Sequence, residues 1–146
     1  MELKNKALFK ESCFVGGKWV DSDSGEMIKV DNPANNEIIG EVPKCSTSET
    51  TKAIKEAQDA FPNWRDKTAK ERSIILQKWA RLIENNVDDL AKIMTVEQGK
   101  PLAEAKGEIN GAADIFEWNA EETKRIYGQT VESRFEDTRV HVYYQP

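Results

Sequence analysis

Residues Val96 to Glu108 read VEQGKPLAEAKGE, and this stretch separates two helical patterns. An apolar stripe that begins at Val87 stops at Gly99, a residue type that often ends helices because it adopts positive φ without strain. Pro101 suits the first position of the next helix, where its missing N–H is not needed. The stretch therefore predicts one helix ending at Gly99 and another running from Pro101 to about Arg125.

Two further helices upstream are predicted from capping boxes, in which a hydroxyl and a carboxylate satisfy the free N–H groups of the first turn. The pattern occurs at Ser46 with Glu49 and at Thr68 with Glu71. Pro62 is expected to end the first of these helices, because proline interrupts the hydrogen-bond ladder. Asn85 and Asn86 are expected to cap the second.

Short alternating runs of apolar and polar residues before these helices are typical of strands. They lie at 13–15, 18–20, 27–30 and 37–42. Gly16 and Gly17 suit a two-residue hairpin turn, because that turn needs positive φ at both positions. No strand–helix–strand alternation precedes Gln129, so a parallel sheet is not expected within the chain.

Two more strands are predicted at 129–133 and 139–144, joined by a polar connection. Val140, Val142 and Tyr144 give the second strand an apolar face that little remaining chain can cover. The pair is therefore expected to project from the body and to associate with another chain. The predicted fold class is α+β: an N-terminal β-hairpin layer, four helices and a terminal strand pair.

The amino-acid composition and the net charge exclude several classes of protein. The 146 residues are 38% hydrophobic and 32% charged, as in a globular protein expected to bury roughly 70% of its unfolded surface in one core. The net charge of -5 argues against a nucleic-acid surface. No apolar run approaches the roughly 20 residues that span a bilayer, and no signal peptide is evident, so a cytoplasmic location is expected.

Catalytic motifs are scarce. Cys13 and Cys45 lie 32 residues apart without a CxxC pair, and inert structural thiols are the preferred interpretation. His141 is the single histidine, which excludes a site built on two histidines of one chain. The chain has no GxGxxG, P-loop, HExxH or EF-hand motif, so neither a cofactor site nor a metal site is predicted from motifs.

The last predicted helix carries two unusual spacings. Gly107 and Gly111 lie four residues apart and each costs about 1 kcal/mol relative to alanine, which favours tight helix packing or, less often, the approach of a ligand. Glu104 and Glu108 have the same spacing and indicate a solvated acidic face, with a shared carboxylate site as the alternative. Lys100 is expected to pair with its neighbour Glu97.

Several segments, in order, resemble the N-terminal portion of the aldehyde dehydrogenase superfamily. VEQGKPLAEAKGE is similar to a signature stretch of the succinate-semialdehyde dehydrogenases, to which the chain looks closest. The resemblance extends to FVGGKW from Phe14 to Trp19, to Asn32-Pro33-Ala34, and to IFEWNAEETKRIYG from Ile115 to Gly128. It covers the chain from Cys13 onward.

The resemblance implies a parent enzyme with an α/β fold. That enzyme would use NAD or NADP to oxidise a semialdehyde, with succinate semialdehyde as the favoured substrate. Residues 1–127 would form the N-terminal part of the cofactor-binding domain and 128–146 the start of the oligomerisation arm. The Rossmann core and catalytic domain, with the family's nucleophilic Cys, general-base Glu and dinucleotide loop, would be absent. The chain alone is therefore expected to hold no cofactor and to be inactive.

By the same resemblance, Gly107, Glu108 and Gly111 would approach the aldehyde entrance. Asp31 and Glu97 would contribute to a structural cation site, a weaker inference. A homo-oligomer would form through residues 129–144, and the aldehyde would be a partner of the full-length parent only.

Three alternatives remain open at this point. The chain is a segment of an oxidoreductase, whether a truncated gene product or one part of a split enzyme. In the second alternative it is a non-catalytic interaction module or decayed gene product that pairs through its C-terminal strands. The third is a hydrolase that uses Glu104 and Glu108 as a carboxylate pair.

Overall fold

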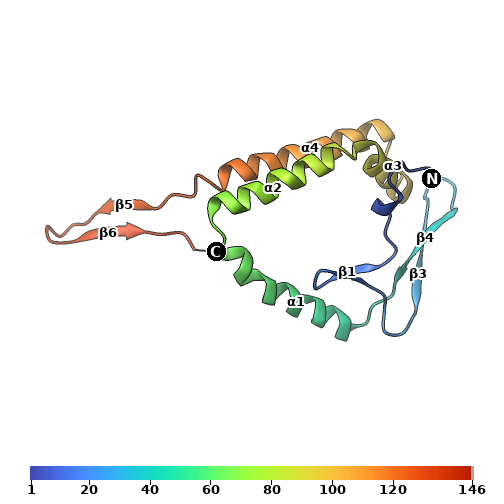
Figure 1. Cartoon of the computed structure of the whole chain (residues 1–146), viewed down its shortest axis with the longest axis horizontal. Coiled ribbons are helices and arrows are strands. Elements are labelled where there is room, and N and C mark those ends of the chain that lie inside the picture. Colours follow the sequence, from blue (N-terminus) through green and yellow to red (C-terminus); the bar gives the residue numbers. More distant parts are fainter. Residues whose placement is uncertain (146) are drawn as a thin grey trace.

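A computed structural model describes residues 1–145 of the chain and is shown in Figure 1. The helices are a 3-10 turn η1 (Lys6–Leu8), α1 (Thr47–Arg65), α2 (Ala69–Glu84), α3 (Val87–Gln98) and α4 (Leu102–Glu122). The strands are β1 (Cys13–Val15), β2 (Lys18–Val20), β3 (Met27–Asp31), β4 (Ile38–Pro43), β5 (Gln129–Glu132) and β6 (Arg139–Val142). Within residues 1–145 they form three separate antiparallel pairs, β1–β2, β3–β4 and β5–β6. The predicted α+β arrangement, without a parallel sheet, is confirmed.

Local signals placed most of the turns and caps correctly. Gly16 and Gly17 have φ of 56° and 79° and form the turn between β1 and β2. Both capping boxes are present. In each, the hydroxyl of the N-cap residue accepts from the main-chain N–H of the glutamate, and the glutamate carboxylate accepts from the main-chain N–H of the N-cap residue. Gly99 has φ of 74° and its N–H donates to the Thr95 carbonyl at 2.9 Å, which ends α3.

Two of the predicted helix ends differ from the structure, and one predicted cap is confirmed. Pro62 lies inside α1, because the helix tolerates its missing N–H and the Pro62 carbonyl still accepts from the Asp66 N–H at 3.0 Å. The predicted cap of α2 is confirmed, since Asn85 is its C-terminal cap residue and the Asn86 side-chain amide donates to the Leu82 carbonyl at 2.7 Å. At its far end α4 stops at Glu122 instead of Arg125, because the Arg125 N–H turns back to the Glu122 carbonyl at 2.8 Å in a tighter turn.

Helices α2 and α4 lie side by side, and α3 packs against α4 at one end of this layer (Figure 1). The apolar residues buried within it are almost all small, which lets the helix axes approach closely. They are Ala80, Ala91, Ala105, Ala113 and Ala120, joined by Leu3 from the N-terminal segment.

The expectation of a large core is wrong. The chain exposes 11179 Å², whereas a compact protein of 16.6 kDa exposes about 7,600 Å². It therefore buries only about half of its unfolded surface. Helix α1 has no buried residue, and it diverges from the α2–α4 layer in Figure 1. Its apolar side chains stay open, with Ile54 64% and Phe61 41% exposed.

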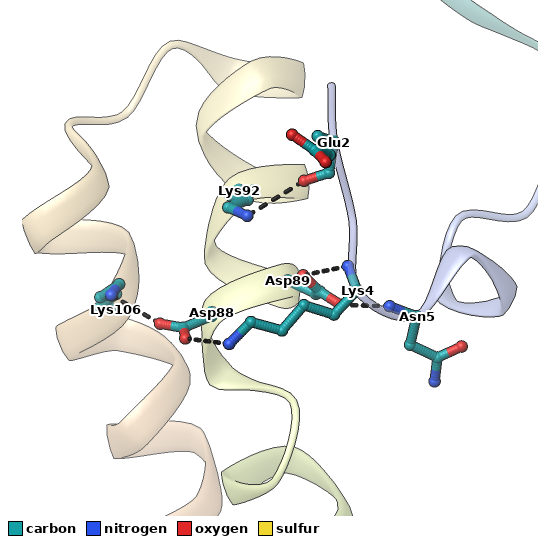
Figure 2. A network of polar contacts seen from close by, with 7 residues as sticks. All are labelled: Glu2, Lys4, Asn5, Asp88, Asp89, Lys92 and Lys106. Carbon is teal, nitrogen blue, oxygen red and sulfur yellow. Dashed lines mark hydrogen bonds and ion pairs between the residues drawn. The ribbon is translucent and has the colours of Figure 1, made fainter.

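The N-terminal segment is held by the first turn of α3, as Figure 2 shows. Asp89 is buried, and its carboxylate accepts from the main-chain N–H groups of Lys4 at 3.1 Å and Asn5 at 2.7 Å. Asp88 beside it pairs with the ammonium groups of Lys4 at 3.1 Å and Lys106 at 2.7 Å. Two adjacent carboxylates thus join the start of the chain, α3 and α4.

Strands β5 and β6 project from the body as a hairpin arm, as predicted (Figure 1). The strands are shorter than expected, ending at Glu132 and Val142. Val131 lies opposite Val140, and Val142 lies opposite Gln129. The two opposed valines are 45% and 41% exposed, so the apolar face of the arm is open.

Candidate functional site

The predicted entrance residues lie on one side of α4. Gly107 is exposed and Gly111 is half-buried, and a Cβ added at either would meet no heavy atom within 4 Å. The preferred interpretation, tight helix packing, is therefore wrong within residues 1–145. Within the described chain, no neighbouring residue comes so close that a side chain at either position would clash with it. Gly107 and Gly111 therefore form an unobstructed strip on the surface of α4.

Glu108 lies next to this strip and forms an ion pair with Lys100, in the connection between α3 and α4. The predicted pairing of Lys100 with Glu97 is thus wrong, because the connection turns the lysine toward α4. The Glu108 carboxylate faces a cation instead of sharing a site with Glu104. This arrangement does not favour a proton shared between two carboxylates, which requires them to be close and mutually repelling.

Asp31 and Glu97 come from the end of β3 and the last turn of α3, and both are exposed. The two elements do approach each other, since a Cβ built on Gly99 would lie 3.1 Å from Cγ of Pro33. Within residues 1–145, however, no three His, Cys, Asp or Glu side chains gather where they could hold a metal ion. Two carboxylates alone fall short of the six to eight oxygens that a cation such as Ca²⁺ takes.

An unpredicted feature is the meeting of the two thiols. The Sγ atoms of Cys13 in β1 and Cys45 before α1 lie 3.8 Å apart. Cys13 is half-buried and Cys45 is exposed. No sequence signal announces this contact, because the residues are separated by 32 positions and belong to different elements.

The thiols line an open cleft of about 600 Å³ between the β1–β2 hairpin and the first turns of α1. Partial desolvation, then the Cys13 thiol and then the carboxylates of Glu49 and Asp23, raise the pKa of Cys45. The main-chain N–H groups of Ser46 and Asp23 lower the pKa of Glu49. A carboxylate therefore lies beside the Cys45 thiol and disfavours its thiolate, so the nearby helix N-terminus does not activate it as a nucleophile.

The strand pairing bears on the expected lack of a cofactor site. Dinucleotides bind at the carboxyl edge of a parallel sheet, against a glycine-rich turn that opens a helix. Residues 1–145 contain only isolated antiparallel pairs, and none leads into such a turn. None of the helices within residues 1–145 has both the length and the hydrophobicity of a transmembrane span.

Comparison with known proteins assigns the chain to a family. The sequence profile of the aldehyde dehydrogenase family matches residues 19–146. The chain belongs to the aldehyde dehydrogenase family. The family match confirms the resemblance, and it spans both the NPA and the VEQGKPLAEAKGE segments.

Relatives of this aldehyde dehydrogenase chain include semialdehyde dehydrogenases. The chain is 54% identical over its whole length to a glutarate-semialdehyde dehydrogenase of Pseudomonas putida, and spans 30% of that protein. It is 51% identical to the succinate-semialdehyde dehydrogenase (NADP+) of Escherichia coli, again spanning 30% of it.

Solved structures agree on the fold. The crystal structure of an NADP-dependent enzyme from Escherichia coli superposes with a TM-score of 0.92 at 50% identity, covering 96% of this chain and 29% of that one. A succinate-semialdehyde dehydrogenase from Burkholderia pseudomallei gives 0.90 at 47% identity, covering 95% and 29%. The aldehyde dehydrogenase chain thus spans about 30% of the relatives it matches.

Proposed function

We propose that this chain serves as the N-terminal part of an NAD(P)-dependent semialdehyde dehydrogenase that oxidises succinate semialdehyde. The observation that carries the proposal is the 51% identity to the succinate-semialdehyde dehydrogenase of Escherichia coli along the whole chain. The glutarate-semialdehyde dehydrogenase relative, at 54%, makes the homologous semialdehyde the second substrate to test. Residues 1–127 would belong to the cofactor-binding domain and 128–146 to the oligomerisation arm.

The role proposed for the chain is to supply packing surface and one edge of the substrate entrance. Large apolar side chains stay open on α1, α2 and α4, which supports their burial by further polypeptide. Those of α2 and α4 include Ile74, Trp79, Leu82, Ile115 and Trp118, each more than half exposed. The unobstructed strip at Gly107 and Gly111, with Glu108 beside it, supports an aldehyde path along α4.

The proposal assigns no chemical step to this chain. Thiohemiacetal formation needs an activated thiolate, whereas the pKa of Cys45 is raised by its surroundings. Hydride transfer needs a bound nicotinamide, for which the described antiparallel pairs supply no crevice. We therefore expect that the chain alone neither turns over succinate semialdehyde nor gives a saturable signal with NAD or NADP in calorimetry.

Association through residues 129–144 and a cytoplasmic location are part of the same proposal. The projecting β5–β6 arm presents Val131 and Val140 to solvent, and such an edge invites pairing with a second copy. The two free thiols suit a reducing compartment such as the cytoplasm.

A chimera tests the proposal. This chain would replace the matching N-terminal 30% of the Escherichia coli succinate-semialdehyde dehydrogenase, and NADP+ reduction would be followed with succinate and glutarate semialdehydes. Activity toward succinate semialdehyde, together with none from the isolated chain, is the expected result. A chimera that assembles like its parent but oxidises neither semialdehyde would overturn the proposal.

A further inference from the structure

We propose that Cys13 and Cys45 are a site of oxidative modification, at which a small disulfide such as oxidised glutathione converts the two thiols into one intrachain disulfide. The bond would join β1 to the residue that precedes the N-cap of α1. It is independent of the dehydrogenase activity, and neither cysteine has a part in the proposed packing surface or entrance.

The geometry of the thiols carries the inference. Their Sγ atoms, 3.8 Å apart, are already in van der Waals contact, whereas a disulfide needs about 2.05 Å. Cys45 is exposed and the adjoining cleft is open, so a small disulfide can reach its sulfur. Bond formation requires the two sulfur atoms to approach by roughly 1.8 Å, while other contacts keep the two segments that carry them together.

Three hydrogen bonds hold those segments. On the Cys13 side, the Ser12 hydroxyl donates to Oδ1 of Asp21 at 2.9 Å, which fixes the start of β1 against the end of β2. On the Cys45 side, the Glu49 carboxylate accepts from the Ser46 N–H and the Asp23 N–H, each at 2.7 Å. Glu49 therefore ties the start of α1 to the loop after β2. The two thiols are preorganised through these polar contacts.

The chemistry balances as two exchange steps. The exposed Cys45 thiol loses its proton to solvent, and its thiolate attacks one sulfur of oxidised glutathione, forming a mixed disulfide and releasing one glutathione thiolate. The raised pKa of Cys45 makes this step slow, so the reaction is followed to equilibrium. The Cys13 thiolate then attacks Sγ of Cys45, forming the intrachain bond and releasing the second. The two protons lost by the cysteines leave with the two glutathione molecules. The cysteines are oxidised by two electrons and glutathione disulfide is reduced by two.

The full chain would be equilibrated at micromolar concentration in glutathione redox buffers, quenched with an alkylating reagent and examined by intact mass and tryptic mapping. Trypsin places the cysteines in different peptides, ESCFVGGK (11–18) and CSTSETTK (45–52), so the linked pair is identified directly. We expect the wild-type chain to lose two hydrogens and to yield this linked pair. A Cys13→Ser variant should instead retain one glutathione on Cys45.

Glu49→Ala tests preorganisation, with Glu71→Ala as its matched control. Both remove the carboxylate of a capping box, but only Glu49 also holds the Asp23 loop. Glu49→Ala should lower the effective concentration of the thiol pair roughly tenfold, while Glu71→Ala should leave it nearly unchanged. Ser12→Ala leaves both helix caps intact and should lower the effective concentration of the thiol pair by a smaller factor. This variant replaces Glu49→Ala as the test if Glu49→Ala does not fold.

Several results would overturn the proposal. They are a wild-type chain that keeps two free thiols, one that keeps a stable glutathione adduct, and one that cross-links only between chains. Equal effects of Glu49→Ala and Glu71→Ala would reject the preorganising role assigned to Glu49.

Discussion

Trp79 of α2 and Phe116 of α4 stack with their ring centroids 4.4 Å apart and their planes 31° from parallel. Trp79 is still 53% exposed, and the buried residues of these two helices are all small: Ser73, Ala80, Ala105, Ala113 and Ala120. Aromatic pairs at this separation contribute about 0.5–1.5 kcal/mol beyond the area they bury. This contact is therefore expected to matter in a chain whose core is small.

Removing the ring of Phe116 should lower the free energy of unfolding. We expect Phe116→Ala to cost about 2 kcal/mol, from the lost stacking and the lost half-buried area. Trp118→Ala is the control, because Trp118 lies on the same helix and is 70% exposed. It should change stability by less than about 0.5 kcal/mol. Urea unfolding followed by circular dichroism measures both, and equal costs would contradict the packing described.

Alanine at two glycines should have opposite effects. Gly99 has φ of 74° and its added Cβ would lie 3.1 Å from Cγ of Pro33, so Gly99→Ala should destabilise the chain by about 1–2 kcal/mol. Gly107 lies within α4 with open space around it, so Gly107→Ala should stabilise the chain by about 0.5–1 kcal/mol. Thermal unfolding distinguishes them.

The same Gly107→Ala substitution also tests the proposed entrance when it is placed in the active chimera. A methyl group on that strip should lower kcat/KM for the aldehyde while the protein becomes no less stable. Unchanged kinetics would remove Gly107 from the entrance.

Asp88 should give the chain an acid-sensitive component of stability. Hydrogen bonds from Lys106 and Lys4, reinforced by their charges, lower the pKa of Asp88 from 3.8 to about 2. Because the folded-state pKa lies below that of the unfolded chain, the stabilisation is complete above pH 3.8 and is lost as the pH falls toward 2. Both the carboxylate and its lysines are substantially exposed, so added salt should weaken the effect.

Asp88→Asn should flatten the dependence of stability on pH across this interval. Asp114→Asn, on the same helix as Lys106 and outside the ion pairs of residues 1–145, is the control. Denaturant unfolding at a series of pH values between about 2 and 5 measures the slopes. A variant with the wild-type slope would show that Asp88 does not carry this component.

The β5–β6 arm should make the chain associate as its concentration rises. Val142→Asp places a charge on the apolar face of β6 and should weaken the association, whereas Arg139→Lys, which retains the charge at the other end of β6, should have little effect. Light scattering over a concentration series measures both. A strictly monomeric wild-type chain with well-protected amides in β5 and β6 would rule out association through the arm.

Features determined by neighbouring residues could be predicted from the sequence. The Gly16–Gly17 turn, both capping boxes and the Gly99 helix end each depend on residues within four positions of one another. The helix end predicted at Pro62 is wrong because the helix continues past it to Arg65, and the Pro62 carbonyl still accepts from the Asp66 N–H.

Contacts between distant side chains could not be predicted in this way. The Cys13–Cys45 contact depends on how the hairpin lies against α1, and the Lys100–Glu108 pair on how the connection turns. Neither arrangement follows from periodicity. The expectation of a large core failed for another reason: the area relation assumes a rounded molecule, whereas α1 and the β5–β6 arm diverge from the helical layer.

The hydrogen bonds between Asp89 of α3 and the N-terminal segment have a consequence for folding during synthesis. Lys4 and Asn5 are translated before their acceptor, Asp89, by 85 and 84 residues. At about 5–20 residues per second, the beginning of the chain stays without that partner for roughly 4–17 s. The N-terminal segment should therefore become protected only after α3 has been translated, although it is itself translated much earlier. Nascent chains stalled at increasing lengths would reveal this as protease sensitivity near residue 5 that persists until α3 has emerged.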